Sequence, residues 1–165
     1  MLLEEAKALA LELMKQHKLE HWHFEFDGAK RRFGICRYNT KTIGLSKHLV
    51  LLNSKESVTD TILHEIAHAL VGLGQGHNWV WRQKALEIGC NGKRCHSDED
   101  TQSVERSFIA ICPKCAEKYG RFKVPKKKSS CGKCSGGKFN EAYLLEFKRA
   151  KVFAPNAQSL STRKV

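Results

Sequence analysis

The chain of 165 residues lacks any long apolar run, and charge interrupts its N-terminal region. A membrane-spanning helix needs about 18 or more consecutive apolar residues, and no segment approaches that length. The N-terminal sequence MLLEEAKALALELMKQHKLE places acidic residues directly after its first leucines, unlike the apolar region of a secretory signal. We therefore expect a cytoplasmic monomer that is neither secreted nor bound to a membrane.

Acidic residues are also scarce, since 17 Asp+Glu face 29 Lys+Arg and leave a net charge of +12. The excess is uneven. Residues 1–95 carry 14 basic and 10 acidic side chains, whereas residues 96–165 carry 15 and 7. A charge of +8 over the last 70 residues favours an anionic polymer such as nucleic acid as the partner.

Cysteine, in contrast, is abundant, with seven residues in a chain that shows no export signal. Such cysteines are more often thiols or metal ligands than disulfides. CPKC and CGKC are two C-x2-C motifs separated by 15 residues, and this spacing is a strong zinc signature. Four thiolates leave no open position on the metal, so this zinc is predicted to be structural. Its ligands are Cys112, Cys115, Cys131 and Cys134.

The first hundred residues combine helical and strand patterns. Apolar residues at helical spacing predict a helix over 3–17, and HWHFEFD, RRFGICRYN and TKTIGLS predict three short strands. We expect these strands to form a small antiparallel sheet. Asn53 and Glu56 resemble a capping box that opens a helix over VTDTILHEIAHALVGL, and NWVWRQKALEI predicts another helix, closed by Gly89.

The segment LHEIAHALVGLGQGHNW carries the most specific chemistry. His64 and His68 are four residues apart, so on a helix both imidazoles lie on one face and can bind one ion. Glu65 lies beside the first histidine and can act on water rather than on the metal. This is the H-E-x-x-H arrangement of zinc peptidases, in which zinc activates water.

A third ligand is needed, and two residues compete for that role. The glycine-rich segment after Gly72 is long enough to return His77 to the ion, because five residues span up to about 17 Å. Glu87 is the other candidate for the third ligand. If one helix joins His77 and Glu87, it holds them about 15 Å apart, so only one of them can bind the ion. We favour His77. Position 74 is Gly, which excludes a third histidine six residues after the second.

Residues 20–95 resemble the SprT-like zinc metalloprotease family, to which Spartan belongs. The resemblance is carried by the strand ending in IGLS, by the HEIAH helix, and by the GH that precedes an aromatic-containing helix. It implies a DNA-dependent protease that degrades proteins trapped on DNA, with three histidine ligands and Glu65 as the general base. Many relatives read Gly-His-Gly where this chain has Asn78, a residue that can cap the next helix.

The resemblance extends to the cysteines, since many bacterial relatives carry a zinc ribbon after the protease. The expected fold is α+β and zincin-like: a sheet packed on an HExxH helix over residues 1–106, a ribbon over 107–152, and a disordered tail over 153–165. DNA and DNA-bound proteins are the expected partners, which predicts association with the nucleoid. Lysines around the ribbon are the predicted DNA contacts: Lys123, Lys126, Lys127, Lys128 and Lys133.

The alternative function is a non-catalytic, nucleic-acid-binding ribbon protein acting in transcription or repair. The intact Glu65 favours the protease, with one catalytic and one structural Zn²⁺. Several residues stay open: Cys36, Cys90 and Cys95 as thiols, or Cys90 and Cys95 with His96 as a further metal site; Trp79 and Trp81 as packing or base-stacking residues; Tyr38 and His48 as oxyanion partners.

Overall fold

The computed structural model describes residues 1–94 and 101–150, and the chain divides into two compact units. The first unit is Met1–Val104, and the second begins at Glu105. Cys95, His96 and the tail expected at 153–165 lie outside the described residues. No helix in the described part of the chain is long and apolar enough to cross a membrane.

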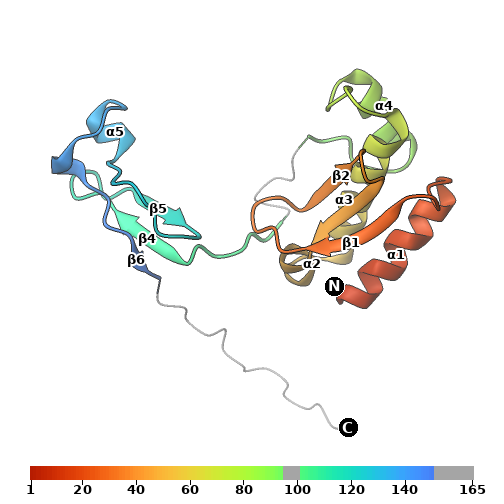
Figure 1. The fold of residues 1–165 in the computed structure, drawn as a ribbon, viewed down its shortest axis with the longest axis horizontal. Helices are drawn as coiled ribbons and strands as arrows, with labels where there is room; N and C mark the ends of the chain where they lie inside the picture. Colours follow the sequence, from red (N-terminus) through yellow and green to blue (C-terminus); the bar gives the residue numbers. More distant parts are fainter. Residues whose placement is uncertain (95–100, 151–165) are drawn as a thin grey trace, which may run out of the picture. The chain divides into compact units, whose positions relative to one another are not determined.

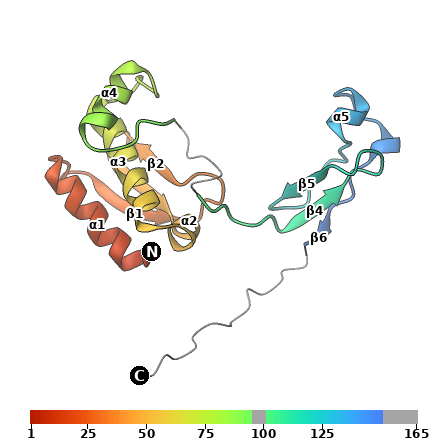
Figure 2. The ribbon, with the colours of Figure 1, turned by 180° about the vertical axis from the view of Figure 1, so that it is seen from behind.

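The first unit has two helices packed together on one side of a three-stranded sheet (Figure 1). The elements of this unit are α1 (Leu3–Gln16), β1 (His23–Asp27), β2 (Gly34–Arg37), β3 (Thr42–Ser46), α2 (Lys47–Leu52), α3 (Lys55–Val71) and α4 (Trp79–Glu87). Helix α1 packs against α3 and β1, whereas α3 packs on β2 and β3 and is followed by α4. Figure 2 shows the same arrangement from behind, with α2 and α4 near opposite ends of α3.

The predicted α+β class is confirmed, but the sheet is mixed rather than purely antiparallel. Its order is β1-β3-β2, with β1 parallel and β2 antiparallel to β3. All five residues of β3 are buried, so this strand takes the central position and separates β1 from β2. The chain after β1 leads past the end of β3, where Ser46 donates a hydrogen bond to the Ala29 carbonyl.

A single apolar core holds α3 in place. Val58, Ile62 and Ile66 recur every four residues along α3 and are fully buried against Ile43 and Leu45 of β3 and the small residues of α1. Each fully buried aliphatic side chain contributes about 1.5–3 kcal/mol. Because packing fixes this face of α3, the rest of the helix, which carries His64 and His68, is also held in a defined position.

The N-terminus of α3 differs from the prediction. Ser54, not Asn53, caps the helix by accepting a hydrogen bond from the Ser57 amide. Asn53 instead ends α2, a helix that the sequence pattern did not reveal, and its side-chain amide donates to the carbonyls of Leu49 and Gln102. The Asn53 Oδ1 accepts a 2.6 Å hydrogen bond from the Gln102 amide, so the acceptor that a helix cap needs is already engaged.

The two ends of α4 follow the sequence prediction. The Asn78 side chain accepts a hydrogen bond from the Trp81 amide, which caps the N-terminus. At the other end Gly89 has a φ of 90°, and the amides of Gly89 and Cys90 bond back to the carbonyls of Leu86 and Ala85. This is a Schellman motif, whose left-handed residue favours glycine.

The second unit is a small antiparallel sheet with two short helical turns. Its elements are β4 (Phe108–Ile111), β5 (Lys118–Arg121), α5 (Gly132–Ser135), the 3-10 turn η1 (Glu141–Tyr143) and β6 (Lys148–Arg149), in the strand order β5-β4-β6. Four residues form its buried cluster: Ala110, Cys112, Cys131 and Leu145. Two of the four are cysteines, so apolar packing alone provides little stability for this unit.

Candidate metal centres

Three imidazoles converge at the C-terminal part of α3. His64 and His68 lie one turn apart on the helix, and His77 returns to them from the loop after Gly72. The Nε2 atoms are 2.9 Å apart for His64 and His77, 3.1 Å for His68 and His77, and 3.3 Å for His64 and His68. Glu87 lies elsewhere, with its carboxylate 2.6 Å from Lys84 Nζ.

These distances suit a tetrahedral ion with one position open. Zn–N bonds of about 2.0–2.1 Å place two nitrogen ligands about 3.3 Å apart, close to the separations observed. Burial, and then His77, lowers the pKa of His68 to about 4, and burial also lowers the pKa of His77. Both rings are therefore neutral near pH 7, which is the form that binds a metal.

Trp81 forms the wall against which all three histidines pack. Its ring centroid lies 4.6 Å from those of His64 and His77 and 5.2 Å from that of His68, where the rings stack. Trp81 is only 1% exposed, whereas Trp79 is 73% exposed. Trp81 is therefore a packing residue rather than a base-stacking one. Its indole restricts the movement of the three histidine rings before any ion binds.

Glu65 lies buried on the side of α3 that faces β2. Burial raises the pKa of its carboxyl to about 8, against the opposing effects of the Arg32 charge and of a hydrogen bond from the Cys36 amide. Position 34 must be small here, because a Cβ on Gly34 would lie 2.5 Å from Glu65 Oε1 and 2.9 Å from Thr61 Cγ2. No sequence pattern pointed to Gly34, since the requirement arises only where strand and helix meet.

We expect Gly34→Ala to reduce activity while the metal stays bound. The added methyl group must displace the Glu65 carboxylate, but it does not touch a histidine of the cluster within the contacts described. Gly28→Ala is the matched control, since nothing lies within 4 Å of its added Cβ. Peptide cleavage and zinc content are measured for both variants. Equal cleavage by the two variants would contradict a spatial requirement at position 34.

Of the two oxyanion candidates, only Tyr38 lies beside the histidine cluster. Its hydroxyl donates a 3.1 Å hydrogen bond to the His68 carbonyl, which also accepts from the Gly72 amide. Tyr38 thus supports the last turn of α3, where the chain leaves toward His77. His48 belongs to α2, which precedes the opposite end of α3.

The remaining cysteines of the first unit do not form a third cluster among the described residues. Cys36 is half-buried near Glu65, and burial raises the pKa of its thiol to about 12. Cys90 is buried in the small cluster around Trp81, where burial raises its pKa to about 11. Both thiols are therefore protonated near neutral pH.

The second unit brings its four predicted cysteines together. Their sulfurs lie 3.8 Å apart for Cys112 and Cys134, and 3.6 Å apart for Cys115 and Cys131. Zn–S bonds of about 2.3 Å place tetrahedral sulfur ligands about 3.8 Å apart, so the geometry fits. The Tyr119 hydroxyl lies 3.0 Å from Cys131 Sγ, and this hydrogen bond lowers the pKa of Cys131 to about 6.

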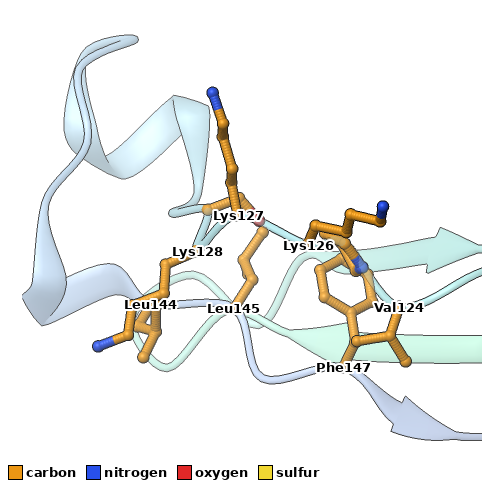
Figure 3. Close-up of a pocket in the computed structure, with 9 residues that line it drawn as sticks. Val124, Lys126, Lys127, Lys128, Leu144, Leu145 and Phe147 are labelled. Atoms are coloured by element: carbon orange, nitrogen blue, oxygen red, sulfur yellow. The ribbon is translucent and has the colours of Figure 1, made fainter.

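The five predicted DNA-contacting lysines differ in their surroundings. Lys126, Lys127 and Lys128 are exposed and line a pocket of about 180 Å³, whose floor includes Val124, Leu144, Leu145 and Phe147 (Figure 3). Lys128 Nζ lies 3.5 Å from a Glu141 carboxylate oxygen, and Lys133 pairs with Glu117 at 2.6 Å. Lys123 is exposed. Salt bridges at the surface are weak, so they do not prevent phosphate binding.

Comparison with known proteins identifies the family of this chain. The SprT-like family model matches residues 3–101, which is more than half of the chain. Among solved structures, the crystal structure of the metallopeptidase zymogen jannalysin from Methanocaldococcus jannaschii is similar over 58% of this chain and 85% of that chain, with 18% identity and a TM-score of 0.43. No curated protein matches significantly. The chain, with its H-E-x-x-H helix and its converging third histidine, belongs to the SprT-like family.

Proposed function

We propose that this protein is a zinc metalloendopeptidase that cleaves proteins bound or crosslinked to DNA, and so acts in the repair of DNA–protein crosslinks. The observation that carries the proposal is the convergence of His64, His68 and His77 beside a buried Glu65. A metal-binding scaffold without catalysis needs the histidines but has no use for a buried carboxylate beside them. The family match supports the same activity.

The residues of the first unit can carry out peptide hydrolysis as follows. When zinc is bound, it supplies a Lewis acid that polarises a peptide carbonyl and makes water more acidic. With a cation bound at the histidine cluster, the ionised form of Glu65 is favoured. Glu65 then removes a proton from the attacking water and passes it to the leaving amine, as general base and then general acid. Trp81 holds the three imidazoles, and Gly34 leaves space for the Glu65 carboxylate.

In the second unit, we propose a structural zinc and a DNA-binding surface. Residues 105–150 contain twelve Lys+Arg and only four Asp+Glu, so this unit is strongly basic even after zinc and four thiolates are counted. Tethering a basic ribbon to a protease raises the local concentration of DNA-bound substrate around the active site. DNA as a partner also implies association with the nucleoid.

Metal analysis is expected to find about two zinc ions per chain, with different resistance to chelators. The histidine cluster has three neutral ligands and one open position, whereas the ribbon has four thiolates and none. A chelator should therefore remove the first ion before the second, and proteolysis should be lost with that first ion. Zinc content and peptide cleavage are followed together during chelation. Loss of both ions at the same rate would contradict two different sites.

Replacing Lys126, Lys127 and Lys128 by alanine is expected to weaken DNA binding and its dependence on salt. Each lost phosphate contact removes about 0.9 from the slope of log affinity against log salt, so the slope falls by up to about 2.7. DNA-dependent cleavage should fall in parallel. Hydrolysis of a small peptide without DNA should change little, because that reaction needs only the first unit.

The matched control removes the same charge from the other unit. Lys7, Lys15 and Lys55 are exposed lysines of the first unit, so their triple alanine variant has the same net charge as the ribbon variant. Fluorescence anisotropy with labelled DNA over a salt series compares the two. If both variants keep the wild-type slope, the DNA contacts lie elsewhere, and if wild-type protein never cleaves a DNA-bound protein, the non-catalytic alternative is preferred.

A further inference from the structure

The segment that delivers His77 also presents large apolar side chains to solvent. Leu73 is 77% exposed and Trp79 is 73% exposed, and Leu70 and Val80 are exposed as well. We call these four residues the apolar rim. Scattered exposed apolar residues are ordinary on protein surfaces, but here all four lie within the eleven residues 70–80, around one ligand.

The rim lies within reach of a substrate bound at the histidine cluster. Trp79 follows His77 by two residues, so their Cα atoms are at most about 7 Å apart. Leu70 follows His68 by two residues on α3 and points to a different side of that helix, so the inference rests mainly on Leu73 and Trp79. An extended peptide advances about 3.4 Å per residue, so residues within about three positions of the scissile bond can meet the rim.

The charge around the rim favours a peptide over DNA as its occupant. Residues 71–81 contain no Lys, Arg, Asp or Glu, and residues 1–104 carry 14 basic and 13 acidic side chains. Arg94 lies near enough to His77 that its charge, after burial, lowers the pKa of that histidine. Phosphate recognition needs several cations, and these are concentrated in the second unit.

We infer that the apolar rim is a substrate-specificity site that binds a bulky apolar side chain within three residues of the cleaved bond. The inference rests on the proposed protease function. It defines the substrate as a chain segment that exposes apolar side chains, as an unfolded or partly unfolded protein does.

The test is a peptide library that is cleaved without DNA and analysed by mass spectrometry. Wild-type protein is expected to cut preferentially where a Leu, Phe or Trp side chain lies within three residues of the bond. Leu73→Ser and Trp79→Ser should lose this preference. For a matched pair of peptides that differ only by Phe or Gly near the cut, kcat/KM for the Phe peptide should fall about tenfold, mainly through KM, and that for the Gly peptide should change less than twofold.

Three controls make the outcome decisive. Leu51→Ser changes an exposed leucine on α2, 55% exposed, and should keep the wild-type preference. Trp79→Phe should restore the preference lost in Trp79→Ser. Zinc content is measured for every variant, because Leu73 and Trp79 flank His77 in the sequence. A rim variant that loses zinc is compared with wild type only after zinc is restored to the same stoichiometry.

The possible failures are distinguishable. Wild-type cleavage with no side-chain preference overturns the rim inference and leaves the protease intact. No cleavage at all, by wild type as by Glu65→Gln, overturns the proposed function itself. If Trp79→Ser weakens binding of single-stranded DNA and leaves KM for the Phe peptide unchanged, the rim binds nucleobases and the inference is wrong.

Discussion

Glu65→Gln is expected to lower peptide cleavage by at least about a hundredfold, the scale of a general acid–base contribution. The amide keeps the shape of the buried side chain and leaves the three histidines intact, but it cannot accept the proton of water. Zinc content should therefore equal that of wild-type protein. Thermal stability should not fall, because burial already disfavours the charged form of this carboxyl, as its raised pKa shows.

His64→Ala provides the contrasting variant for this experiment. It removes a ligand rather than the base, so both metal and activity should be lost. Metal analysis, thermal melting and peptide cleavage are measured on both variants. Cleavage by Glu65→Gln at a rate within tenfold of wild type would falsify the assignment of Glu65 as the base.

Cys131→Ser is expected to unfold the second unit while the first continues to work. The buried cluster of this unit consists of two cysteines and only two apolar residues, Ala110 and Leu145. A structural zinc contributes on the order of 10 kcal/mol to the folding of such small modules. Without it, the remaining apolar burial does not offset the loss of chain entropy.

The measurements for this variant are zinc content, amide exchange over residues 105–150 and cleavage with and without DNA. One zinc should remain, the second unit should exchange rapidly, and DNA should no longer stimulate cleavage. Small-peptide hydrolysis should stay near the wild-type rate. Cys90→Ala, which removes a buried thiol of the first unit, should keep the zinc of the second. Protection from exchange in Cys131→Ser would show that the ribbon folds without its full ligand set.

Local patterns in the sequence predicted most of the elements, because their signals lie within a few neighbouring residues. The apolar spacing of α1, the alternation in β1 and the Asn78 cap are of this kind. The order of strands is different, since it depends on which strand can be buried on both faces. That property belongs to β3 as a packed strand, which lies between β1 and β2.

The same distinction applies to the site. His64, Glu65 and His68 are contiguous on one helix, so their geometry follows from helical periodicity. His77 needed an argument about chain reach, and only the structure shows it 2.9 Å from His64. Gly34 and Trp81 act through contacts with residues far away in the sequence, and a single sequence contains no local mark of such contacts.

The loop that carries His77 has a thermodynamic consequence for the assembly of the enzyme. Gly72, Gly74 and Gly76 adopt φ values of 83°, 92° and 54°, where an alanine is strained, so these positions cannot easily be made stiffer by substitution. Ordering the loop therefore costs conformational entropy, about 1–2 kcal/mol per residue, which must come out of the free energy of metal binding. Binding of the ion therefore helps to order the loop, and loss of the ion is expected to release His77 and Leu73 together.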